Sequence, residues 1–103
     1  MAVGRAAMVN DRVTVVLTES LLEDGLADLR WQLRSLVLSG AREIVVDVAG
    51  MGELSSGVVT VLLSTHRVCR ARGGGLVLSN ASRRTAELLQ RTGLSRVLLR
   101  DTD

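Results

Sequence analysis

Short apolar segments that favour strands alternate with longer amphipathic segments that favour helices along most of the chain. Residues 12–18, 43–48 and 76–79 are rich in β-branched and apolar side chains, as β-strands are. Between these segments, leucine and valine recur at the three- and four-residue spacing of a helix. A strand–helix–strand order requires crossover connections, which are right-handed and place helices against a mainly parallel sheet. The alternation therefore predicts an α/β fold.

Two long helices are predicted between the strand segments. The first has acidic residues near its start, where the helix dipole favours them, and Gly40 where a left-handed C-terminal cap is expected. The second begins at Ser55 or Ser56 and ends at the glycine run 73–75. The apolar positions of the first helix are Leu22, Leu26, Leu29, Leu33, Leu36 and Val37. The predicted inner face of the second helix holds Val58, Val61, Leu62, Thr65, Val68 and Cys69.

The remaining residues complete one domain. A third helix is predicted from near Ser82 to Gly93, and residues 96–99 are predicted to form a last strand. The residues before Asn10 leave room for one extra edge strand. Residues 43–48 are nearly continuously apolar, which predicts a strand buried on both faces. We expect residues 1–103 to form a single domain with a mixed, mainly parallel sheet of four to five strands.

The composition excludes several classes of protein. The hydrophobic fraction of 47% is typical of a packed domain, and Trp31 is the only aromatic residue, so leucine and valine must fill the core. Cys69 is the only cysteine, which rules out an internal disulfide and a cysteine-based metal site. Residues 1–10 lack the apolar stretch of a signal peptide, and the apolar run 58–63 is too short to span a bilayer. We expect a cytoplasmic protein that does not insert into a membrane and needs neither metal nor cofactor.

The positive charge is weak support for nucleic-acid binding. All 13 basic residues are arginine and the net charge is only +2, and the chain lacks the aromatic residues that stack on bases. The charge is also unevenly distributed, because residues 1–65 hold 5 Arg and 8 acids whereas residues 66–103 hold 8 Arg and 3 acids. Two interpretations stay open, a solvated surface with uneven charge and a docking face for an acidic partner.

No catalytic residue is predicted. His66 is the only histidine, and it falls at the margin of the predicted inner face of its helix, which indicates a partly exposed helix residue. Cys69 is interpreted as a small buried hydrophobe. The glycine run 73–75 lacks the Lys and Ser/Thr of a phosphate-binding loop and precedes a strand instead of following one. The chain is therefore not expected to be an enzyme.

The segment 50–58, Gly-Met-Gly-Glu-Leu-Ser-Ser-Gly-Val, is the strongest functional candidate. It follows the carboxyl end of a strand and opens a helix, where α/β proteins place functional loops. Ser55 or Ser56 is expected to cap that helix, and this local role is a sufficient explanation by itself. The second interpretation is that a kinase phosphorylates one hydroxyl. The helix dipole and free N–H groups would tolerate the phosphate, while a partner packed on the same surface would be repelled.

Several landmarks along the chain resemble those of the STAS (sulfate transporter and anti-sigma antagonist) family, specifically the bacterial anti-sigma factor antagonists. They are Asp47 at a strand end, Ser55-Ser56-Gly57, the glycine run 73–75, and Gly93-Leu94 before the last predicted strand. These features occur in the order that the family shows. With the first strand and helix included, the resemblance covers about residues 12–100.

The resemblance implies a role in transcription regulation through protein–protein contact. In this family the dephosphorylated antagonist binds an anti-sigma factor, which is also a serine kinase, and so frees a sigma factor. Phosphorylation by that kinase ends the interaction, and a phosphatase restores it. By position, Ser55 is the phosphorylated residue, with Ser56 as second choice. The implied partner-binding residues are Glu53, Leu54, Ser55, Ser56 and Gly57.

The chain departs from the family pattern in two places. Residues 19–22, Glu-Ser-Leu-Leu, replace the usual turn after the early strand, and Leu54 stands where the family has an acid just before the serine, with Glu53 one residue earlier. Two other function classes therefore stay open. One is a STAS subunit of an ABC-type lipid transporter that packs on an ATPase subunit without phosphorylation, with which Leu54 is compatible. The other is a small enzyme, which the lack of a base–nucleophile pair disfavours.

Overall fold

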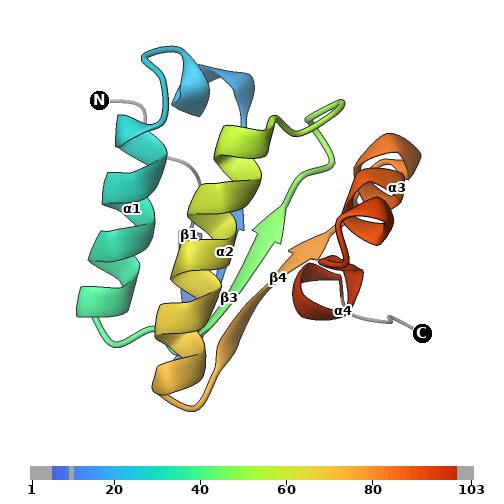
Figure 1. The fold of residues 1–103 in the computed structure, drawn as a ribbon. Helices are drawn as coiled ribbons and strands as arrows, with labels where there is room; N and C mark the ends of the chain where they lie inside the picture. The colour runs from blue at the N-terminus through green and yellow to red at the C-terminus, as the bar shows by residue number, and fades with distance from the viewer. Residues whose placement is uncertain (1–5, 10, 100–103) are drawn as a thin grey trace.

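The sheet of the computed structural model, which describes residues 6–9 and 11–99, is ordered β1-β2-β3-β4. β1 (Ala6–Val9) pairs antiparallel with β2 (Arg12–Val16). Parallel pairs join β2 to β3 (Glu43–Asp47) and β3 to β4 (Gly75–Ser79) (Figure 1). The α/β class and the parallel pairing agree with the sequence prediction, and β1 occupies the place allowed for an extra edge strand.

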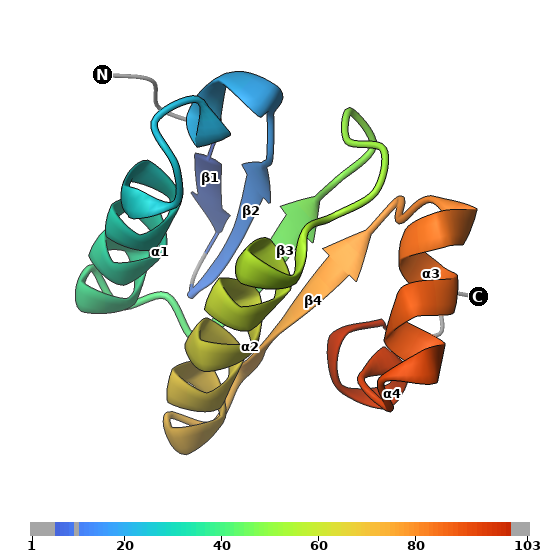
Figure 2. The ribbon, with the colours of Figure 1, turned by 45° about the horizontal axis from the view of Figure 1, so that its top comes forward.

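The helices that connect the parallel strands lie on one face of the sheet. α1 (Ala27–Leu38) connects β2 to β3, and α2 (Ser56–Ala71) connects β3 to β4 (Figure 2). The strand order never reverses, so two right-handed crossovers place both helices on the same face. α3 (Arg83–Arg91) and the short α4 (Ser95–Leu98) follow β4 and lie beside it in both views.

The main core lies between this face and the two long helices. From the strands it contains Val13, Val15, Ile44, Val46, Leu76 and Leu78. From the helices it contains Leu29, Leu33, Val37, Val58, Leu62 and Cys69. The prediction that residues 43–48 are buried on both faces is wrong, since Val45 and Asp47, which point to the other face, are only half-buried. That follows from the one-sided arrangement of α1 and α2.

The first predicted helix is divided into two parts. Residues Glu19–Leu22 form a 3-10 turn, η1, in which the Thr18 hydroxyl oxygen accepts a hydrogen bond from Leu21 N at 3.3 Å. Gly25 then has φ +89°, a left-handed conformation that interrupts a helix. The chain therefore enters α1 only at Ala27, with Asp28 as the acid in its first turn. Gly40, with φ +105°, lies just beyond the end of α1, as predicted.

The limits of α2 agree with the sequence prediction, but its inner face differs. Ser55 caps the start of the helix, and after its end Gly73 has φ +90°. A Cβ at Gly74 would overlap the Arg42 carbonyl oxygen, so this position requires glycine. Val68 is 48% exposed, which contradicts its predicted place on the inner face. It precedes the buried Cys69 by one residue, a rotation of about 100° around the helix.

The predicted strand at residues 96–99 is wrong. Ser95–Leu98 form the helical turn α4, in which Leu98 N donates to the Leu94 carbonyl at 2.9 Å. This turn places Leu98 in the core with no exposed surface. Only Leu99 is extended, and it forms an isolated parallel bridge with Leu78. The parallel part of the sheet therefore has three strands instead of the four that the sequence pattern predicts.

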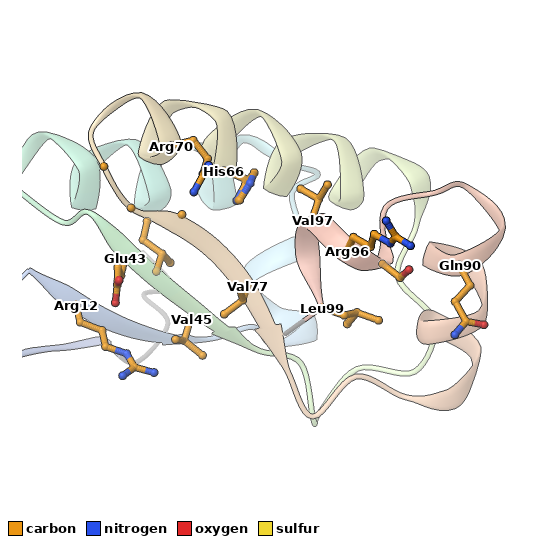
Figure 3. A pocket seen from close by; sticks show the side chains of 15 residues that line it. Arg12, Glu43, Val45, His66, Arg70, Val77, Gln90, Arg96, Val97 and Leu99 are labelled. Carbon is orange, nitrogen blue, oxygen red and sulfur yellow. The ribbon is translucent and has the colours of Figure 1, made fainter. Parts of the chain in front are cut away.

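A side chain of α2 closes part of the free edge of β4. The Leu76 backbone N–H donates to Nδ1 of His66 at 2.9 Å. An open depression of about 880 Å³ lies along this edge and is lined in part by His66, Arg70 and Arg96 (Figure 3). His66 is half-buried, as predicted, and it satisfies a strand amide that has no neighbouring strand to bond to.

We predict that His66→Ala lowers the free energy of unfolding by about 1–3 kcal/mol, because it leaves the part-buried Leu76 N–H without an acceptor. His66→Asn is the matched control, since its Oδ1 lies near the position of Nδ1 and can accept the same bond. Urea unfolding followed by circular dichroism measures both variants. Equal losses for the two variants would contradict a role for this hydrogen bond.

Candidate functional site

The loop between β3 and α2 carries the predicted site, and three buried side chains fix it to the core. Val48 is 1% exposed, Met51 7% and Leu54 2%, whereas the residues between them are exposed. Met51 N also donates to the Val48 carbonyl at 3.0 Å, which closes a turn. The loop is therefore held against the protein, and only selected residues face solvent.

The start of α3 holds the same loop from the side. The Ser82 hydroxyl donates to the Gly52 carbonyl at 2.9 Å, and the hydroxyl of the fully buried Thr85 donates to the same oxygen at 3.3 Å. Ser82 also caps α3 by accepting from Thr85 N at 3.1 Å. Arg84 and Glu53 form an ion pair that contributes little to stability, because it is exposed and its N–O distance is 3.9 Å. The two hydroxyl contacts thus connect the loop to α3.

A side-chain pair links the ends of the two strands that precede these elements. Asp47, at the end of β3, accepts through Oδ1 from Ala49 N at 2.9 Å and from Asn80 Nδ2 at 3.2 Å. Asn80 follows β4 and has φ +59°, a conformation that asparagine tolerates better than most residues. The sequence prediction used Ser82 only as the start of a helix, and it did not select Asn80 or Thr85. The signal that could have found these residues is the predicted parallel pairing of the strands, because the loops that follow neighbouring parallel strands emerge at the same end of the sheet.

Ser55 is the N-cap of α2, as the sequence predicts for one of the two serines. Its hydroxyl oxygen accepts from Val58 N at 3.2 Å, and its carbonyl accepts from Val59 N at 3.1 Å. The residue is exposed, so the hydroxyl is accessible from solvent while it caps the helix. Ser56 is also exposed and is the first residue of α2.

The other predicted contact residues have different environments. Glu53 is exposed and lies beside Arg84. The Leu54 side chain points into the core. A partner that docks on this surface therefore contacts the residues on either side of Leu54 and not its side chain. Gly57 is half-buried, and a Cβ there would come within 3.0 Å of Leu26 Cδ1. The glycine therefore lets the segment before α1 pack closely against the first turn of α2.

His66 and Cys69, both on α2, serve the fold. His66 Nδ1 is occupied by the backbone of Leu76. Cys69 is buried, and desolvation raises the pKa of its thiol although the charge of Arg72 opposes that rise. A thiol with a raised pKa is a poor nucleophile at neutral pH.

Over residues 6–9 and 11–99, we find no group of three His, Cys, Asp or Glu side chains placed to hold a metal ion. No helix in that part of the chain is both long and apolar enough to cross a bilayer.

Solved structures with the same arrangement of elements include the protein TM1081 of Thermotoga maritima, with a TM-score of 0.80 and 18% identity over 99% of this chain and 83% of that one. The unphosphorylated anti-sigma factor antagonist SpoIIAA has a TM-score of 0.78 and 22% identity over 97% of this chain and 89% of that one. The phosphorylated form of the Bacillus cell fate determinant SpoIIAA has a TM-score of 0.69 and 21% identity over 97% and 92%. At these identities the likeness establishes the fold.

The family assignment comes from the sequence. The family model described as "Mlab, STAS domain" matches residues 5–100, whereas no curated protein matches the chain. The match includes the strands, the helices and the β3–α2 loop. The chain belongs to the STAS domain family.

We predict that Ser55→Ala lowers the free energy of unfolding by about 1 kcal/mol, because the cap of α2 is lost. Ser56→Ala is the matched control, since the Ser56 side chain makes no hydrogen bond among the described residues, and its effect is expected to stay within about 0.5 kcal/mol. Urea denaturation of both variants measures the difference. Equal effects would show that Ser55 does not act as the cap in solution.

We further predict that the family's acid cannot be restored at position 54 without a large loss of stability. Leu54→Ala is expected to cost about 2–5 kcal/mol, because it opens a cavity in the core. Leu54→Asp is expected to cost more, because it also brings a carboxyl group into apolar surroundings. Thermal and urea unfolding at neutral pH compare the two variants. Wild-type stability of Leu54→Asp would mean that the loop turns this position to solvent.

Proposed function

We propose that this STAS domain is an anti-sigma factor antagonist, which binds an anti-sigma factor with serine kinase activity and thereby frees a sigma factor. Phosphorylation of Ser55 by that kinase ends the interaction, and a phosphatase restores it. The docking surface consists of Glu53, Ser55, Ser56 and Gly57, with the backbone of Leu54. The protein works in the cytoplasm, where it meets these partners.

The observation that carries this proposal is the position of Ser55. It is exposed, yet it lies at the end of a loop that Met51 and Leu54 anchor in the core and that Ser82 holds from α3. A partner therefore meets a surface that is already ordered, and binding costs little conformational entropy. The likeness in fold to SpoIIAA, solved in an unphosphorylated and a phosphorylated form, supports the same interpretation.

A phosphate on Ser55 would change binding while the domain stays folded. It adds a charge of about −1.5 to −2 at neutral pH. At the start of α2 this charge is favourable, because the dipole and the first backbone N–H groups point toward it. A partner surface packed over Ser55 would instead have to bury or repel the phosphate. The fold is therefore expected to remain intact while affinity falls.

Leu54 makes this chain an unusual member of such a group. The position before the serine holds a buried apolar side chain, so the acidic group nearest in sequence is Glu53. We infer that a kinase recognises the loop through Glu53 and the exposed first turn of α2.

A second candidate function is a STAS subunit of an ABC-type lipid transporter, packed on an ATPase subunit without phosphorylation. The buried Leu54 favours it, because the family's acid beside the serine is missing. The description of the matching family model, which names Mlab, also favours it. The two candidates differ in their partner and in whether Ser55 is ever modified.

We predict that Ser55→Asp weakens binding to the anti-sigma kinase encoded in the same genome by more than tenfold, or about 1.4 kcal/mol. Ser55→Asn is the matched control, because asparagine has the same shape and caps a helix as well as aspartate does, without the charge. Isothermal titration calorimetry with the purified kinase measures both affinities. Equal affinity for the two variants would contradict a switch based on charge.

The modification itself is tested by incubating the protein with that kinase and ATP and locating any phosphate by mass spectrometry. The proposal expects the phosphate on Ser55 and none in Ser55→Asn. Tight binding to an ABC-type ATPase, with no phosphate on residues 55 and 56, would support the second candidate instead.

A further inference from the structure

The only aromatic residue of the chain lies on the surface, although the core is otherwise well filled. Trp31, on α1, is 58% exposed, and two further apolar side chains are exposed near α1 and α2, Leu38 at 75% and Val68 at 48%. Tryptophan is enriched at the centres of protein interfaces, because it contributes a large rigid contact area. These three residues lie away from the Ser55 loop and are not part of the proposed switch.

A groove runs between α1 and α2. It has a volume of about 620 Å³, and Val37, Leu38, Val61 and Val68 contribute apolar atoms to its lining. Both helices connect parallel strands, run in the same direction and lie side by side (Figure 1). The α2 wall includes Ser64 and other small hydroxyl residues, which allow close approach by another backbone. An apolar groove between two helices fits an α-helix whose apolar stripe faces inward.

The charged residues that line this groove are both arginines, Arg30 and Arg34. The same two residues line a second hollow of about 570 Å³ on α1, which includes Trp31 and Asp24. Neither arginine belongs to an ion pair within residues 11–99. Two unpaired guanidinium groups beside an apolar groove favour carboxylates on the occupant.

We propose that the α1–α2 groove binds an amphipathic helix of a protein partner whose apolar stripe is flanked by Glu or Asp. The apolar stripe covers Leu38 and Val68, and the acidic side chains pair with Arg30 and Arg34. This surface goes beyond the proposed switch, because its contacts include neither Ser55 nor the β3–α2 loop.

Two other occupants fit less well. A second copy of this chain, placed groove to groove, would bring no carboxylate to Arg30 and Arg34, because the groove lining contains no acidic residue. An anionic membrane would attract Arg30 and Arg34, but Glu23, Asp24 and Asp28 at the start of α1 lie on the same stretch of chain and would be repelled. An acidic helix confined to the groove avoids both obstacles, because it brings carboxylates to the two arginines and none of these acids lines the groove.

The test uses two synthetic helical peptides of about 20 residues, enough for more than five turns. Both carry leucine at the buried heptad positions; one has glutamate at the flanking positions and the other lysine. Each peptide carries a fluorescent label, so its fluorescence anisotropy reports binding. Neither contains tryptophan, so the emission of Trp31, which lines the adjacent hollow, reports contact at the margin of the groove. We expect the glutamate peptide to bind at least tenfold more tightly and to shift the Trp31 emission to shorter wavelength. We expect Arg30→Glu/Arg34→Glu to reverse this preference.

A matched control keeps the result specific. Arg91→Glu/Arg96→Glu changes the net charge equally at exposed positions outside the groove and is expected to keep the wild-type preference. Circular dichroism and urea midpoints verify that both double variants are folded. Equal binding of the two peptides, or equal effects of the two double variants, would overturn the proposal. A dimer of the wild-type protein that dissociates in Arg30→Glu/Arg34→Glu would also overturn it. So would binding of the wild-type protein to phosphatidylglycerol vesicles without binding to the glutamate peptide. Retention of this peptide preference in Ser55→Asp would separate the groove from the switch.

Discussion

Parallel pairing of β3 with its two neighbours places Asp47 opposite Val16 on one side and Ser79 on the other. The carboxyl ends of the three strands therefore lie at one edge, and the loops that follow β3 and β4 emerge side by side. Asp47 can then bond Asn80, and Ser82 can reach the Gly52 carbonyl. The ordered position of Ser55 depends on this register, because a shift of β4 along β3 would move α3 away from the loop that it holds.

The same constraint decides where apolar residues are needed. Both crossover helices cover one face of the sheet, so the loop that leads into α2 must cross the end of the core, and Met51 and Leu54 fill that end. An acid at position 54 would have to leave the core or be buried without compensation. In this chain the demand of packing thus prevails over the acidic group that the family places beside its serine.

Local chemistry made much of this arrangement predictable. Ser55 and Ser82 precede helices at positions where their hydroxyl groups satisfy free backbone N–H groups, and Gly40 and Gly73 follow helix ends. Residues 96–99 were mistaken for a strand because four residues do not distinguish a helical turn from a strand by periodicity. The contacts of Ser82 and Thr85 with Gly52 were missed because they join residues 30 or more positions apart. The exposure of Val68 likewise depends on how the helices pack.

The two surfaces proposed for this domain respond differently to charge. At Ser55 a phosphate adds a charge of about −1.5 to −2 that a bound partner must bury or repel, so affinity falls for a partner docked on that loop. In the α1–α2 groove, affinity would come from apolar contact with Leu38 and Val68 and from pairing with Arg30 and Arg34, which a distant phosphate leaves intact. α2 carries both surfaces, the cap at its start and the groove beside its later turns. One partner that covered both would keep part of its affinity after phosphorylation. Complete release on phosphorylation therefore requires that the regulated partner bind only at the Ser55 loop, which leaves the groove free for a different partner.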